Sequence, residues 1–71
     1  MLRKSDDAYM RLYKEKIELQ TKVEKLESFV HDARRGDIAD ITLQEIHILE
    51  EQLHYMRGYL RILNQRLAIV S

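Results

Sequence analysis

The segment from about residue 46 to 70 carries two hydrophobic seams side by side, both with the 3–4 spacing of an α-helix. The first seam consists of Ile46, Leu49, Leu53, Met56, Leu60, Leu63, Leu67 and Val70. The second seam follows Ile48, Gln52, Tyr55, Tyr59, Ile62, Arg66 and Ile69. A helix that packs against one partner needs only one such stripe. Two adjacent stripes indicate a helix with several neighbours, and in a chain of 71 residues most of them must come from other copies.

Composition leaves oligomerisation as the main source of stability. A chain of 71 residues buries only a thin core, and domains of this size commonly depend on disulfides, metals or association. Cysteine is absent, which excludes disulfides and thiolate zinc sites, and three histidines alone do not make a structural zinc site. His47 with Glu51, and Glu50 with His54, have a spacing that could clamp a metal. A solvated helix surface explains these pairs better, so we expect neither a metal nor a cofactor.

No stretch of the sequence has the character of a membrane span or a signal peptide. The longest apolar runs are a few residues, against the ~20 that a transmembrane helix needs. The first seven residues lack an apolar core, and a net charge of +0 gives no global field that would attract DNA. We therefore expect a cytoplasmic protein that binds neither membrane nor DNA.

The periodicity predicts an all-α chain with two helices in an antiparallel hairpin, as one domain over residues 1–71. Ser5 is a plausible N-cap for a first helix over about 6–35, and Gly36 fits the left-handed position that ends a helix. The bend occupies 36–41, and Thr42 with Glu45 has the pattern of a capping box. The second helix then covers about 42–69. The first helix carries its own 3–4 repeat, formed by Tyr9, Leu12, Lys16, Leu19, Val23, Leu26 and Val30.

Polar groups at seam positions leave two interpretations open. Lys16, Gln52 and Arg66 occupy such positions, where burial is costly unless the groups are paired. They either fix register and copy number, as polar residues in coiled coils do, or converge on a polar ligand between protomers. Catalysis is poorly supported, because a two-helix hairpin offers no pocket of its own for a nucleophile and its base. We expect no catalytic residue.

Tyrosine supplies four of the five aromatic residues, in the i,i+4 pairs Tyr9/Tyr13 and Tyr55/Tyr59. Each pair forms a ridge along its helix. Tyrosine packs well in semi-polar interfaces, which accounts for at least some of these rings. A flat ring beside arginine also suits a nucleobase, which stacks on the ring while guanidinium groups hold phosphate.

Two groups of basic residues are candidates for holding an anion. Arg34 and Arg35 precede the bend, where their guanidinium groups, the Thr42 hydroxyl and free N–H groups at a helix start could meet one phosphate. The alternative is that both arginines only cap the first helix. In the second helix, Arg61 and Arg66 lie beyond Glu51, the last acid of the chain, where they either complement the helix dipole or hold an anion.

The chain resembles a family of very small phage proteins that form helical hairpins. The resemblance spans about residues 13 to 69 and is carried by Glu18-Leu19, by residues 22–29 and by Glu50, Glu51, Gln52, Leu53, Met56, Tyr59, Leu63, Arg66 and Leu67. Its most distinctive part is the run from Gln52 through Met56 and Tyr59 to Arg66. Some members of that family are anti-CBASS sponges, which sequester the cyclic oligonucleotide signals of bacterial immunity.

The resemblance implies a homohexamer that holds cyclic dinucleotides in pockets between protomers and, in some members, cyclic trinucleotides elsewhere. It implies a first site with stacking by Tyr13 or Tyr9 and phosphate contacts near the bend. Transferred to this sequence, the first site comprises Tyr9, Tyr13, Lys16, Arg34, Arg35 and Thr42. The second site comprises Arg66 with Arg61. The bend here is also acidic, with Asp37 and Asp40, which departs from the family pattern.

The sequence therefore favours a non-catalytic phage sponge for cyclic di- and trinucleotides, acting in the host bacterial cytoplasm as a homo-oligomer. A structural or adaptor coiled coil without a small-molecule ligand is one alternative, in which every polar seam residue fixes the register. A small RNA-binding hairpin dimer that uses Arg57 and Arg61 is the other. It predicts an affinity for RNA that falls steeply with salt.

Overall fold

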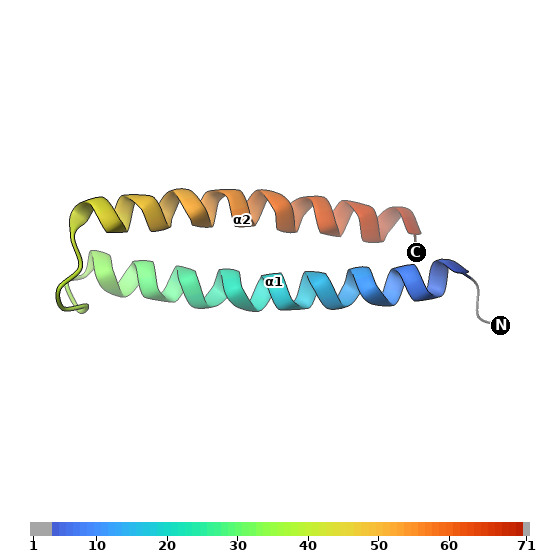
Figure 1. The fold of residues 1–71 in the computed structure, drawn as a ribbon, viewed down its shortest axis with the longest axis horizontal. Helices are drawn as coiled ribbons and strands as arrows, with labels where there is room; N and C mark the ends of the chain where they lie inside the picture. Colours follow the sequence, from blue (N-terminus) through green and yellow to red (C-terminus); the bar gives the residue numbers. More distant parts are fainter. Residues whose placement is uncertain (1–3, 71) are drawn as a thin grey trace.

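The chain folds into an antiparallel helical hairpin in the computed structural model, which describes residues 4–70 and their side chains from residue 7 onward. Helix α1 covers Lys4–Arg34 and helix α2 covers Leu43–Val70. The two helices lie side by side along their whole length, with the bend at one end and both chain ends at the other (Figure 1). The hairpin measures 54 × 15 × 12 Å. The predicted all-α hairpin is confirmed, with helix ends within two residues of the expected positions.

The start of α1 differs from the prediction. The helix begins at Lys4, so Ser5 lies inside it and not at the N-cap position before its first turn. The side chain of Ser5, and with it the capping bond expected of it, lies outside what the structure describes. The helix thus includes two acidic residues, Asp6 and Asp7, in its first turn.

The end of α1 has the geometry of a Schellman motif. Gly36 has a φ of 83°, in the left-handed region where glycine carries no steric penalty. Its N–H donates to the carbonyl of Ala33 at 3.1 Å, and the N–H of Asp37 donates to the carbonyl of Asp32 at 2.9 Å. These two bonds satisfy carbonyls that the last helical turn leaves free. The prediction that Gly36 ends the first helix is confirmed.

The start of α2 is the predicted capping box. The N–H of Glu45 donates to the Thr42 hydroxyl oxygen at 3.1 Å, while the N–H of Thr42 donates to the Glu45 carboxylate at 3.0 Å. The Thr42 hydroxyl also donates to that carboxylate at 3.0 Å. The hydrogen bonds from Thr42 hold the pKa of Glu45 below its ordinary value, the backbone bond contributing most. Glu45 therefore stays charged at the positive end of the helix dipole.

The core of the hairpin is the first seam of α2 packed on the repeat of α1. Leu63 has no solvent exposure, and with Leu12 and Leu67 it forms a buried cluster toward the open end, against which Tyr9 and Leu19 pack. Toward the bend the buried residues are Val23, Val30, Ala33, Ile46 and Leu53. Ala33 was not part of the predicted repeat.

Two ion pairs join the helices along one side of the hairpin. Arg34 donates from Nε and Nη2 to both oxygens of the Glu50 carboxylate, at 2.8 and 2.6 Å, in a bidentate pair. Arg57 donates from Nε to the Glu27 carboxylate at 3.1 Å, and its Nη2 contacts the same oxygen. Both pairs are solvent-exposed, so their main effect is to fix how the two helices are aligned.

The pair between Arg34 and Glu50 makes the stability of the hairpin depend on pH. The hydrogen bonds from Arg34 lower the pKa of Glu50 from its ordinary value of 4.5. At mildly acidic pH the folded chain therefore binds fewer protons here than the unfolded chain, so this contribution is complete above about pH 4.5 and is lost as the pH falls through the folded pKa. We expect Glu50→Gln to lose less unfolding free energy on acidification than the wild type, as measured by urea unfolding at several pH values. Glu51→Gln is the matched control, because Glu51 is a neighbouring carboxylate without an ion pair among the described residues. This variant should lose as much unfolding free energy on acidification as the wild type.

Candidate functional site

The second seam of α2 lies on the surface of the hairpin. Tyr55 is 67% exposed and Ile69 is 83% exposed, and Ile48, Tyr59 and Ile62 are exposed as well. The polar members of the seam, Gln52 and Arg66, are also exposed. The prediction that α1 does not cover this seam is confirmed, and each hairpin is left with a long apolar face.

A second apolar patch lies on the outer surface of α1 and is separate from the second seam. It contains the exposed side chains of Met10, Tyr13 and Ile17. A shallow hollow of about 530 Å³ lies over it, lined also by Arg11, Lys14 and Glu18. The hairpin therefore presents two apolar surfaces that neither of its helices covers.

The structure brings together the part of the first predicted site that lies on α1. The rings of Tyr9 and Tyr13 are stacked, with centroids 6.1 Å apart and planes inclined by 10°. The ammonium group of Lys16 lies 5.8 Å from the centroid of the Tyr13 ring. Tyr9 is partly buried and packs against the core cluster, whereas Tyr13 is 42% exposed. Tyr13 is thus the more exposed ring of the pair, and the Lys16 ammonium group lies over it.

The residues predicted to bind phosphate near the bend are all engaged with acids of their own chain. Arg34 holds Glu50 through two hydrogen bonds, and Arg35 lies 3.4 Å from the Asp37 carboxylate. Thr42 uses both its hydroxyl and its N–H in the capping box. Arg34 also lies 18 residues beyond Lys16 on the same helix, which is about 27 Å along its axis. The two halves of the first site therefore do not meet within one chain.

The two arginines of the second predicted site line different hollows. Arg61 lines a shallow hollow of about 550 Å³ on the outer surface of α2, together with His54, Tyr55, Arg57, Gly58, Tyr59 and Ile62. Arg66 lines a groove between the two helices. One chain does not combine Arg61 and Arg66 in a single site.

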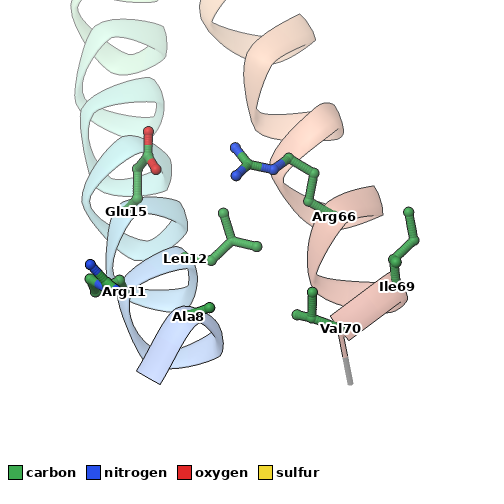
Figure 2. A pocket seen from close by; sticks show the side chains of 7 residues that line it. All are labelled: Ala8, Arg11, Leu12, Glu15, Arg66, Ile69 and Val70. Atoms are coloured by element: carbon green, nitrogen blue, oxygen red, sulfur yellow. The ribbon is translucent and has the colours of Figure 1, made fainter. Parts of the chain in front are cut away.

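The groove that contains Arg66 lies at the open end of the hairpin. It has a volume of about 460 Å³ and is lined by Ala8, Arg11, Leu12, Glu15, Arg66, Ile69 and Val70. The Arg66 guanidinium points across the groove from α2 toward α1, where the Glu15 carboxylate lies on the opposite wall (Figure 2). Glu15 accepts a hydrogen bond from the Tyr59 hydroxyl, and this bond raises the pKa of Tyr59. Arg11 and Glu15 were not predicted from the sequence, because both flank the hydrophobic repeat of α1.

A further pair of basic residues lies midway along the hairpin and was also not identified from the sequence. Lys22 and Lys25 line a hollow of about 370 Å³ with Leu26, Phe29, Gln52 and Met56. Neither lysine has an ion pair with another described residue. Their spacing of three on a helix that also carries Phe29 is the signal that could have found them.

No three histidine or acidic side chains among the described residues are grouped closely enough to hold a metal ion. Neither of the two described helices is long and apolar enough to cross a membrane. What the hairpin offers is an arrangement of rings, cations and apolar surface that suits noncovalent binding.

Comparison with curated proteins and with solved structures gives no significant match. The sequence model of the Sequestin family, in contrast, matches residues 6–69, which include nearly all of both helices and the bend. The family name describes sequestration, in agreement with the sponge-type resemblance inferred from the sequence. The chain belongs to the Sequestin family.

Proposed function

We propose that this protein sequesters cyclic di- and trinucleotide immune signals without altering them, holding each ligand between copies of itself. The observation that carries the proposal is the placement of Tyr13 and Lys16 beside an apolar patch that the hairpin leaves uncovered. Membership in the Sequestin family supports capture of a ligand over catalysis. Because these signals are made inside bacteria, the protein acts in the cytoplasm of the host.

Tyr13 and Lys16 provide the chemistry that one half of a cyclic dinucleotide requires. A base stacks on the Tyr13 ring in place of the Lys16 ammonium group that lies over it, and the displaced ammonium group meets a phosphate of the same ligand. The stacked pair with Tyr9 holds the Tyr13 ring in place, so little side-chain freedom is lost on binding. Tyr9 itself contributes mainly through the core.

The other half of the first site comes from the bend of a different copy. Arg34, Arg35 and Thr42 lie too far from Tyr13 to reach the same ligand within one hairpin. A phosphate that binds there competes with Glu50, Asp37 and Glu45 for its donors. This competition favours a ligand with two negative charges over a weakly charged one.

Arg66 provides the cation of the second site, which we assign to cyclic trinucleotides. Its guanidinium forms no ion pair with another described residue and points into the groove at the open end (Figure 2). Arg61 lies on a different surface of α2 and joins this site only through a neighbouring copy. Glu15 on the opposite wall suits hydroxyl or amino donors of the ligand, not its phosphates.

Two separate apolar faces on each hairpin support assembly beyond a dimer. A two-fold contact covers one face of each copy and leaves the second face free for a further contact. Combining a two-fold with a three-fold contact yields a closed hexamer, the assembly that we propose.

A calorimetric titration tests the proposal directly. Purified protein is titrated with cyclic dinucleotides, cyclic trinucleotides, their linear forms and adenine nucleotides that carry a diphosphate. We expect saturable binding of a cyclic oligonucleotide, and we expect the ligand to be recovered chemically intact after the protein is denatured. If the protein bound only the adenine nucleotides that carry a diphosphate, a sequestering role would remain, but cyclic oligonucleotides would not be its ligands. No binding across the panel would favour an adaptor coiled coil.

The alternative of an RNA-binding dimer is less well supported by the geometry. Of the two arginines that it requires, Arg57 is bound to Glu27 of α1. Only Arg61 on that surface lacks an ion pair with another described residue. Its hollow is flanked by Tyr55 and Ile62, which form part of the apolar seam.

A further inference from the structure

We propose that a second copy of the chain docks on the second seam of α2 in antiparallel orientation, with a two-fold axis beside Gly58. In this register the second copy closes the groove that contains Arg66. The inference rests on the proposed self-association but not on the identity of the ligand. It follows from three features of α2: the order of residues in the seam, the distribution of charge and the position of its one glycine.

Four apolar members of the seam are arranged symmetrically about a point between Gly58 and Tyr59. Tyr55 and Ile62 lie equally far from that point, and so do Ile48 and Ile69. Gln52 and Arg66 correspond to within one position. In a two-fold contact each residue faces its counterpart on the other copy. An antiparallel pair therefore places apolar side chains against apolar ones and the two polar residues against each other.

The proximity of Gln52 on one copy to Arg66 on the other offsets the cost of burying polar groups in the seam. Among the described residues, the Gln52 amide nitrogen reaches only the sulfur of Met56, at 3.8 Å, and the amide oxygen accepts no hydrogen bond. The Arg66 guanidinium has donors to spare. The second copy's Gln52 can accept from Arg66, which gives both groups a partner when water is excluded. The second copy's Ile48 then lies over Ile69, at the edge of the groove.

The charges on α2 favour the antiparallel orientation over the parallel one. All the acids of this helix lie in its first half, at Glu45, Glu50 and Glu51, and all its arginines lie in the second half, at Arg57, Arg61 and Arg66. Glu51, Arg61 and Arg66 form no ion pair with another described residue, and antiparallel docking sets Glu51 of each copy against the basic half of the other. Parallel docking would set like charges together, which is unfavourable.

Gly58 is hard to explain from the hairpin alone. A glycine inside a helix costs about 1 kcal/mol relative to alanine. No atom of the chain lies within 4 Å of where its Cβ would be, apart from its neighbours and its own helix backbone, so α1 does not require a glycine here. A missing side chain permits close approach of another backbone. At the centre of the proposed contact, Gly58 leaves room for a side chain of the second copy in the hollow beside Tyr55 and Ile62.

Cross-linking through single cysteines tests the register, because the natural chain has no cysteine. Ile48→Cys and Ile69→Cys are each treated with a short bis-maleimide, alone and after mixing and co-refolding. We expect the mixture to give covalent dimers. Ser28→Cys, which places the thiol on the exposed surface of α1, is the control, and each variant alone should give no higher yield of covalent dimer than this control. Dimers from Ile69→Cys alone would overturn the antiparallel orientation. If the protein is oligomeric but the mixture gives no cross-link between the two variants, a different surface contacts the seam and the proposed register is wrong.

A substitution at Gly58 provides a second test, independent of cross-linking. Gly58→Leu should fill the hollow and reduce the native mass at a concentration where the wild type is associated, with helix content by circular dichroism unchanged. Ser28→Leu adds the same side chain on α1 and should keep the wild-type mass. An unchanged mass for Gly58→Leu would overturn the inference. Ligand binding that persists in that variant at the reduced mass would leave the proposed sequestration standing.

Discussion

Leu63→Ala should lower the free energy of unfolding by about 2–5 kcal/mol. Leu63 has no solvent exposure and lies at the centre of the cluster with Leu12 and Leu67. A hairpin this thin has no second layer that can collapse into the cavity left by the missing methyl groups. Because the single core of a chain this short rarely supplies more than about 3–5 kcal/mol, the variant should be partly unfolded near room temperature. Urea unfolding followed by circular dichroism, at a fixed protein concentration, measures the change.

Asn64→Ala is the matched control for this experiment. Asn64 is the next residue on the same helix and is exposed. Its substitution should change the free energy of unfolding by no more than about 0.5 kcal/mol. Equal effects of the two substitutions would mean that the first seam does not form the core of the hairpin.

Tyr13→Ala should weaken nucleotide binding by about 5- to 150-fold, which corresponds to ~1–3 kcal/mol for one stacked base. The Tyr13 ring is exposed and contacts Tyr9 and Lys16, not the buried leucines, so helix content should not change. Calorimetric titration of the variant with the ligand that the wild type binds best measures the loss. The native mass of the variant should equal that of the wild type.

Two further variants separate stacking from packing. Tyr13→Phe keeps the ring and should bind with nearly wild-type affinity. Tyr9→Ala removes a ring that packs on the core cluster and should lower the stability of the hairpin as well. Dissociation of the oligomer in Tyr13→Ala would show that this ring belongs to an interface between copies and would remove the proposed stacking site.

The hairpin itself could be predicted because its signals are local in the sequence. The 3–4 repeats place one stripe of each helix in the core, and the buried residues from Leu12 to Leu67, apart from Ala33, follow them. Gly36 ends α1 for a reason confined to its own φ angle. The capping box between Thr42 and Glu45 spans only one turn. Each of these signals acts within a few residues, so no knowledge of the other helix was required.

The candidate site was less predictable because it depends on how the helices are rotated and on what the charged groups already bind. The engagement of Arg34 with Glu50, and of Arg57 with Glu27, requires knowing which flanks of α1 and α2 face each other. The separation of Arg61 from Arg66 is different, since five residues on a helix turn the side chain by about 140°. That separation could have been deduced from spacing alone. The groove with Glu15 became visible only with both helices in place.

The central claim is that copies of this chain cover each other's apolar faces and enclose the ligand between them. The most direct test is the native mass of the purified protein at micromolar concentration, measured by native mass spectrometry with and without added ligand. We predict a closed multiple of the chain mass, with six copies in the proposed assembly, and an added mass that matches intact ligand. A stable, folded single chain without bound nucleotide would contradict the claim.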